Sequence, residues 1–216
     1  MSRTPSETAE PSRARPLLGP ALVVLAAVLV LVPGLGDTGV WTLGELPVLD
    51  RVLAQLGEPR AEMLRSPWLP DHLRAWAYAA AGRSDFGLRL PGALAGVGLV
   101  GLTLIAARRL GFAPCYAALA GCFALATPSL LAGARTALGN PTGELWISAA
   151  ALALVAGLAG SREQGWGARL GLIGVGLACL VAAVASVGIV LGACLPLTVV
   201  ALADLADSPS RWRSRR

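Results

Sequence analysis

Hydrophobic residues along this chain gather in long blocks rather than in the three-to-four-residue rhythm of a soluble helix. The blocks cover residues 17–33, 90–107, 113–132, 143–160 and 170–205. The last block would extend about 54 Å as one helix, well beyond a hydrocarbon core of about 30 Å. We therefore divide it near Ser186, Val187 and Gly188 into two short spans. The pattern predicts an all-α integral membrane protein with about six transmembrane helices.

Composition supports the membrane class. Of the 216 residues, 55% are hydrophobic and only 14% are charged, and the mean hydropathy is +0.65. A soluble domain of this length needs more polar surface than that. The net charge is +5, but the arginines lie at the ends of apolar blocks and are not interleaved with aromatic residues on one segment. Nucleic acid is therefore excluded as a partner, and membrane lipids are the expected surroundings.

Arginine placement predicts the orientation. If the N-terminus lies in the cytoplasm and six spans alternate, every inner segment carries at least two arginines, as the positive-inside rule prefers. These arginines are Arg3, Arg13 and Arg15, then Arg108 and Arg109, then Arg162 and Arg169, and finally Arg211, Arg213, Arg215 and Arg216. Both termini are then cytoplasmic, with residues 1–16 a disordered tail, 17–205 the membrane domain and 206–216 a basic tail.

A long outer loop, residues 34–89, separates the first two spans in this arrangement. Two helices are predicted within it. Leu49, Val52, Leu53 and Leu56 share one helical face, and Leu73, Trp76, Ala77 and Ala80 repeat that spacing inside a helix expected over 70–82. Both helices are amphipathic enough to lie on the outer membrane surface. Anchoring at the interface and a role in a reaction are the two interpretations of this loop.

Three stretches resemble a known family of membrane enzymes. They are "GRSDFGLRLPGALAG" from Gly82, "AARRLGF" at the end of the next block, and "AALAGCFALATPSLLAGARTALGNP" after it. Together they look like the amino-terminal membrane half of the GT-C glycosyltransferases that use lipid-phosphate-linked sugars. Examples are the dolichyl-phosphate-mannose protein mannosyltransferases and the aminoarabinose transferases. The resemblance covers roughly residues 17–205 and implies a bacterial-type inner membrane and a polyprenyl-phosphate sugar donor.

That resemblance also implies a catalytic position, which this chain has altered. The family carries an acidic pair, usually Asp-Glu, early in the first outer loop, and the aspartate is thought to take the proton of the acceptor hydroxyl. In "VWTLGELPVLD" the best alignment places Gly44 on the aspartate and Glu45 on the glutamate. Glycine offers no base. Asn140 also replaces an acid, and Val187 replaces a lysine expected near the donor phosphate.

Several residues remain candidates for a site. Glu45 is the first choice for a substitute base, with Asp50 or Asp71 behind it. Arg89 and Arg135 are candidates for binding the lipid phosphate, although each is also placed to reach headgroups or to cap a span. The other candidates are Asn140, Glu144 at the start of a span, and His72. His72 is the sole histidine and has no cluster of other ligands in the sequence, so we expect neither a metal nor a cofactor.

Three functions remain open from the sequence. A catalytically degenerate relative would serve as a binding or assembly subunit, holding a lipid-linked sugar or another membrane chain. An active enzyme would move a sugar from a polyprenyl phosphate with Glu45 as the base. A small transporter or channel subunit is the third. Family members usually continue through further spans, so we expect a truncated chain that a partner could complete. Loss of the aspartate favours the first of these functions.

Overall fold

The computed structural model describes residues 15–37, 45–57, 68–158 and 165–213, with backbone alone at 15–17 and 205–213. Every regular element in these ranges is a helix. They are α1 (Arg15–Leu31), α2 (Leu46–Gln55), α3 (Trp68–Ala80), α4 (Asp85–Arg109), α5 (Pro114–Ala126), α6 (Pro128–Arg135), α7 (Pro141–Leu158), α8 (Trp166–Val187) and α9 (Ile189–Arg213). The prediction of an all-α protein is confirmed.

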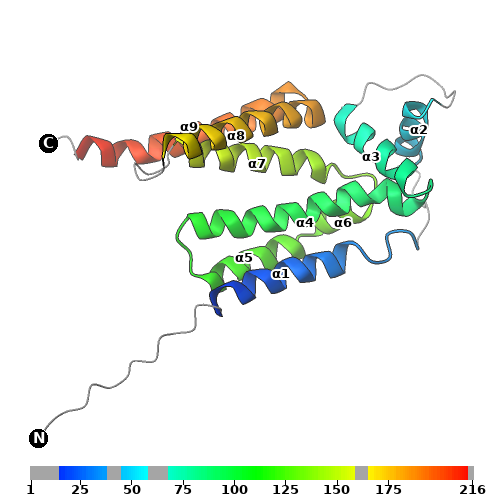
Figure 1. Ribbon diagram of the computed structural model, residues 1–216, viewed down its shortest axis with the longest axis horizontal. Coiled ribbons are helices and arrows are strands. Elements are labelled where there is room, and N and C mark those ends of the chain that lie inside the picture. Colours follow the sequence, from blue (N-terminus) through cyan, green and yellow to red (C-terminus); the bar gives the residue numbers. More distant parts are fainter. Residues whose placement is uncertain (1–14, 38–44, 58–67, 159–164, 214–216) are drawn as a thin grey trace, which may run out of the picture.

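The long helices form two layers that lie side by side (Figure 1). One layer contains α1, α4, α5 and α6, and the other contains α7, α8 and α9, with α4 packed against α7. The short helices α2 and α3 lie together at one end, which we call the α2–α3 end. The opposite end, where α4 finishes at Arg108 and Arg109, we call the arginine end. Helix α1 begins and α9 finishes at the arginine end (Figure 1).

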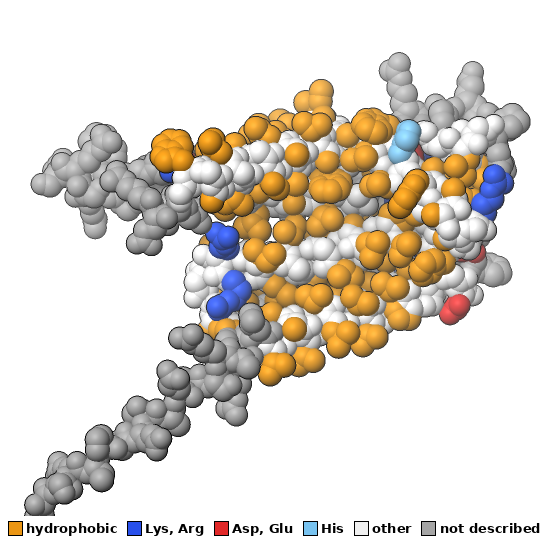
Figure 2. All heavy atoms as spheres, in the orientation of Figure 1, with side chains coloured by type: hydrophobic (Ala, Val, Ile, Leu, Met, Phe, Trp, Pro, Cys, Tyr) orange, Lys and Arg blue, Asp and Glu red, His pale blue; other side chains and the backbone are white. Residues whose placement is uncertain are grey.

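Length and apolar character identify three helices in the described residues that can cross a membrane, namely α4, α7 and α8. A fourth crossing follows if α5 and α6 form one bent span. The apolar parts of α1 and α9, Leu18–Leu31 and Ile189–Asp204, are shorter. Figure 2 shows hydrophobic side chains covering the middle of the visible face, with charged side chains at its two ends. The chain is a multi-pass membrane protein, and the count of six spans stays a prediction.

Two breaks in the helices divide the apolar blocks. Helix α8 stops at Val187 and α9 starts at Ile189, with Gly188 between them at φ 85°. The break that the sequence predicts near Ser186 to Gly188 is therefore present. The block 113–132, expected as one span, is instead bent by 60° between α5 and α6. Pro128 supplies no N–H to the helix, and Thr127 before it takes an extended backbone with ψ 120°.

Helices α2 and α3 occur where the sequence predicts them, although α3 begins at Trp68, two residues before the expected Pro70. Helix α2 buries Val48, Val52 and Leu53 against the protein. Helix α3 turns two charged residues, Asp71 and Arg74, toward the protein and leaves Trp76 75% exposed. An outward tryptophan suits a helix that touches lipid, and the position of both helices on the membrane surface stays a prediction.

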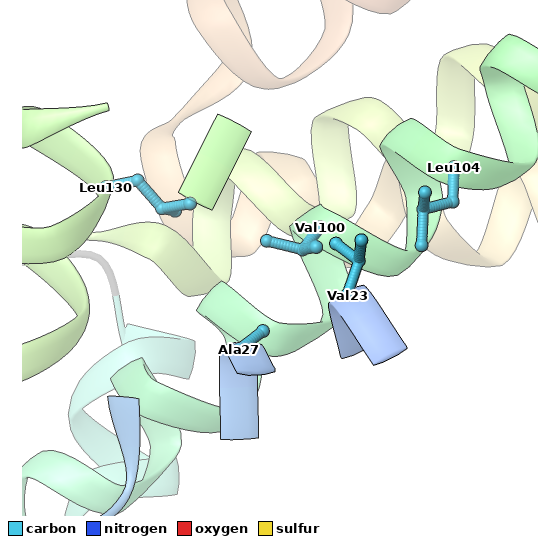
Figure 3. Close-up of a cluster of buried hydrophobic side chains, with 5 residues drawn as sticks. All are labelled: Val23, Ala27, Val100, Leu104 and Leu130. Carbon is cyan, nitrogen blue, oxygen red and sulfur yellow. The ribbon is translucent and has the colours of Figure 1, made fainter. Parts of the chain in front are cut away.

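The core between α1 and α4 is built from small and branched side chains. Figure 3 shows Val23 and Ala27 of α1 against Val100 and Leu104 of α4, with Leu130 of α6 beside them. Each of these side chains is buried. Without a hydrophobic driving force between helices in lipid, close packing of this kind supplies much of their association. The core thereby fixes α4, which carries a charged residue of the site described below.

Gly87 gives the first prediction, because α3 and α4 approach closely there. A Cβ at Gly87 would lie 2.7 Å from the carbonyl oxygen of Ala77 and 2.9 Å from Cα of Tyr78. Both are backbone atoms, which cannot move aside cheaply, so Gly87→Ala is expected to lower the free energy of unfolding by about 1–3 kcal/mol. Thermal unfolding in detergent measures the loss.

The matched control for that substitution is Gly101→Ala in the same helix. A Cβ at Gly101 would meet no atom within 4 Å. Alanine is also the better helix former, so this variant is expected to match or exceed the wild type in stability. Equal unfolding temperatures for the two variants would contradict the tight α3–α4 contact.

Candidate functional site

A buried ion pair joins α4 to the start of α2. Arg89 donates from Nε to Glu45 Oε1 at 3.3 Å and from Nη2 to Glu45 Oε2 at 2.9 Å. Glu45 is 1% exposed and Arg89 is 4% exposed. Glu45 sits immediately before α2, while Arg89 lies in the second turn of α4. The sequence named both residues as candidates but did not predict that they pair.

The same two side chains gather further backbone groups. The Arg89 Nη1 donates to the carbonyl oxygen of Leu35 at 2.9 Å, and the amide of Ala137 donates to Glu45 Oε1 at 2.8 Å. Four chain segments therefore meet at one ionic contact. A buried charge pair is stable only when its remaining hydrogen-bonding capacity is also used, and these backbone contacts use it. We call this set of contacts the Glu45–Arg89 clamp.

A second group of charges surrounds a small cavity next to the clamp. Arg51 of α2 donates from Nε to Asp71 Oδ2 at 2.9 Å, and Arg74 donates from Nη1 to Asp71 Oδ1 at 3.4 Å. Arg74 also donates from Nη2 to the carbonyl oxygen of Gly139 at 2.6 Å. The cavity has a volume of about 170 Å³, and Asn140 lies on its wall with these three side chains. We call it the Arg51–Arg74 cavity.

The electrostatics of this cavity favour an anion. Its two guanidinium groups and single carboxylate carry a net charge of +1. Asp71 is 3% exposed and Arg74 is 7% exposed. Burial lowers the pKa of the Arg74 guanidinium from its usual value, and the neighbouring Asp71 carboxylate partly offsets that effect. Arginine nevertheless stays protonated in proteins. The Asp71 carboxylate is shared between Arg51 and Arg74, so an anionic ligand in the cavity would add a second negative charge beside the two guanidinium groups.

The segment from Thr136 to Asn140 connects α6 with α7 and forms part of both sites. Asn140 donates from Nδ2 to the carbonyl oxygen of Ser186 at 2.9 Å, and its Oδ1 accepts from the amide of Gly143 at 3.1 Å. It therefore caps the start of α7 and ties it to the end of α8. An amide suits this position because it donates and accepts at once. Asn140 also lines the Arg51–Arg74 cavity, and its role in a binding site stays a prediction.

Arg135 lies away from both charged groups. It is exposed and donates to the carbonyl oxygens of Val30 and Pro33, both at 3.3 Å. Val30 lies in the last turn of α1, where carbonyl groups have no partner within the helix, and Pro33 follows two residues after α1 ends. The contact is the span-capping role that the sequence analysis offered as the alternative to phosphate binding.

The remaining candidates are scattered over the surface of the α2–α3 end. Glu144 is exposed in the first turn of α7, and Asp50 is exposed on α2. His72 is exposed, with Nδ1 2.9 Å from the carbonyl oxygen of Trp68. Gly44 lies outside the described residues. Among those that are described, no group of three or more histidines, cysteines and acids comes together.

Sequence reasoning did not single out Arg51 or Arg74. A signal was present, however. Asp71 and Arg74 are three residues apart, a spacing that puts opposite charges side by side on a helix, and they lie among apolar residues in "PDHLRAWAYAA".

The fold and these sites define a multi-pass helical membrane protein with buried ionic groups at one end. The family model for dolichyl-phosphate-mannose-protein mannosyltransferase matches residues 71–214, about two thirds of the chain. The chain therefore belongs to this family and is a glycosyltransferase-like membrane protein. The matched segment includes Asp71, Arg74 and Arg89 but begins after Glu45 and Arg51. No curated protein and no solved structure gives a significant match.

Proposed function

We propose that the protein binds a lipid-linked sugar at the α2–α3 end and does not itself transfer it, serving as a binding or assembly subunit in the membrane. The observation that carries this proposal is the state of Glu45, the best substitute for the missing base. Its carboxylate is almost fully buried, and both oxygens accept hydrogen bonds from Arg89. Gly44, beside it in the sequence, has no group that can accept a proton.

A general base must reach the proton that it removes, directly or through one water molecule. An acceptor hydroxyl would have to displace Arg89 or the Ala137 amide to reach Glu45. Displacing either group leaves a buried charge or a buried amide without its partner, and both outcomes are unfavourable. The clamp is better suited to holding the outer segments in place than to chemistry. Glu45 and Arg89 are then positioning residues for the neighbouring cavity.

The Arg51–Arg74 cavity supports binding of the donor phosphate. Arg89 is engaged with Glu45, and Arg135 caps α1, so neither of the arginines expected from the sequence is the better phosphate site. Arg51 and Arg74 line a shared cavity of about 170 Å³. This volume is several times the roughly 30 Å³ that one water molecule occupies in the liquid. Guanidinium groups bind phosphate oxygens through paired hydrogen bonds.

The membrane setting of the proposal follows the arginine placement. The arginine end faces the cytoplasm of a bacterial-type inner membrane, and the α2–α3 end faces outward with α2 and α3 on the surface. Arg108, Arg109 and Arg169 at the arginine end fit the positive-inside rule. The lipid tail of the bound sugar would then lie along the outward half of the helices.

Sugar transfer is a second candidate function, because Asp71 lies on the wall of the cavity. A carboxylate beside a bound phosphate-linked sugar is in a position to accept a proton. Its oxygens are already engaged with Arg51 and Arg74, and an acceptor hydroxyl would have to displace one of these arginines to reach them. For this reason we place binding without transfer first.

The decisive experiment measures binding and transfer on the same purified protein in lipid nanodiscs, with a polyprenyl-phosphate sugar as the donor. The wild type is expected to bind the donor and to show no turnover with hydroxyl-bearing acceptors. Glu45→Gln is expected to show no turnover either. Turnover is followed by release of polyprenyl phosphate, and binding by retention of radiolabelled donor.

Three outcomes would overturn the proposal in different ways. Turnover by the wild type that disappears in Glu45→Gln would make Glu45 the base, whereas turnover that disappears only in Asp71→Asn would assign that role to Asp71. Absence of donor binding by a folded wild type would remove the lipid-linked sugar as ligand. Asp50→Asn, an exposed acid on the same helix as Arg51, is the matched control and is expected to leave binding unchanged.

A further inference from the structure

An apolar groove lies between α4 and α5 next to the arginine end, away from the charged sites. Its volume is about 640 Å³ and its lining is almost wholly hydrophobic. The floor is made by Ala106 and Ala107 of α4 with Ala120 of α5. Three aromatic side chains, Phe112, Tyr116 and Phe123, form the walls and are each at least half exposed. Small residues facing large ones leave a channel of this kind along a helix pair.

One guanidinium group contacts the backbone of a residue that lines this groove, and a second arginine follows it at the end of α4. Arg108 donates from Nη1 to the carbonyl oxygen of Phe112, a lining residue, at 2.8 Å. Arg109 is exposed beside it, at the last position of α4. Figure 2 shows basic side chains at the end of the body where α4 finishes. The groove therefore offers an apolar channel with positive charge at its mouth.

We infer that this groove holds an anionic glycerophospholipid, with one acyl chain along the alanine floor and the headgroup phosphate at Arg108 and Arg109. Long cationic side chains at a helix end reach the level of the headgroups. Basic residues at that level attract anionic lipids over neutral ones. A flexible acyl chain suits a channel that is open to the bilayer along its length.

This site is separate from the proposed donor site. Helix α4 has 25 residues and is about 37 Å long, and Arg89 lies near its other end. A lipid whose phosphate lies at Arg108 belongs to the opposite leaflet from a donor whose phosphate lies in the Arg51–Arg74 cavity. The inference therefore does not depend on whether the protein binds a lipid-linked sugar.

Native mass spectrometry of the detergent-purified full chain tests the inference. The protein is incubated with equal amounts of phosphatidylglycerol and phosphatidylcholine of the same acyl composition. Phosphatidylglycerol is expected to be retained over phosphatidylcholine by about tenfold or more, because two basic residues face one headgroup. The double variant Arg108→Gln/Arg109→Gln is expected to retain the two lipids equally, and Ala120→Phe, which fills the channel, to retain less of both.

The matched control is Arg83→Gln/Arg135→Gln, which removes two exposed arginines from the α2–α3 end and is expected to keep the preference. Equal retention of the two lipids by the wild type would overturn the inference. So would a preference that survives in Arg108→Gln/Arg109→Gln, or full retention by Ala120→Phe. Displacement of phosphatidylglycerol by added polyprenyl phosphate would assign the groove to an isoprenoid chain instead.

Discussion

Glu45→Ala is expected to lower the free energy of unfolding by about 3–5 kcal/mol, the loss typical when one partner of a buried ion pair is removed. The substitution leaves the Arg89 guanidinium buried without that carboxylate, and it also removes the acceptor for the Ala137 amide. Each loss adds a buried polar group that water cannot reach. Chemical unfolding in mixed micelles, followed by tryptophan fluorescence, measures the change.

A double variant that removes both charges distinguishes the net contribution of the ion pair from the cost of leaving one charge buried alone. Glu45→Leu/Arg89→Met replaces the ion pair with apolar side chains of similar size, and such replacements are often neutral. We expect the double variant to be more stable than Glu45→Ala. Asp50→Ala is the control for losing an acid near α2, and because Asp50 is exposed it should change stability by less than about 0.5 kcal/mol. A loss in Glu45→Ala no larger than that of Asp50→Ala would contradict the clamp.

Arg74→Gln is expected to weaken binding of a polyprenyl-phosphate sugar by about tenfold to a hundredfold, since a hydrogen bond to a charged group contributes roughly 1.5–3 kcal/mol. Glutamine keeps a polar side chain of intermediate length but removes the positive charge from the cavity and the Nη2 donor to the Gly139 carbonyl. Arg51→Gln tests the same charge on a side chain that is 22% exposed and less important for folding. Donor affinity is measured by titration in nanodiscs, with unfolding temperature recorded for each variant.

Arg135→Gln is the comparison that separates the two possible phosphate sites. Sequence reasoning alone made Arg135 a candidate for the phosphate, whereas its contacts lie with the carbonyl groups at the end of α1. The variant is expected to bind donor as the wild type does. Loss of affinity in Arg135→Gln together with unchanged affinity in Arg74→Gln and Arg51→Gln would move the site away from the cavity.

Much of the helical architecture could be predicted from the sequence because its signals are local. The apolar blocks and their flanking arginines indicate where the long helices lie, and Gly188 marks the break between α8 and α9. The bend after Thr127 was missed even though Pro128 is visible in the sequence, because the apolar block continues across it. Hydropathy averages over a window, and a backbone kink changes no hydropathy value.

The candidate site was only partly predictable, since it depends on contacts between distant segments. Glu45 and Arg89 are 44 residues apart, and nothing in the spacing of either says that they pair. Arg74 is buried because α3 turns its charged side toward the 136–140 segment, which a count of apolar residues on α3 does not reveal. The sequence supplied the residue types that bear chemistry, and the packing of α3 on α4 decided which of them are buried.

The Arg89 side chain holds both Leu35 and Glu45, which are the two ends of the connection between α1 and α2. The ends of that connection are therefore fixed to each other independently of the residues between them. Lengthening a closed loop changes its entropy only slowly, so insertion of a few residues between Leu35 and Glu45 is expected to cost little stability while the Arg89 contacts are kept.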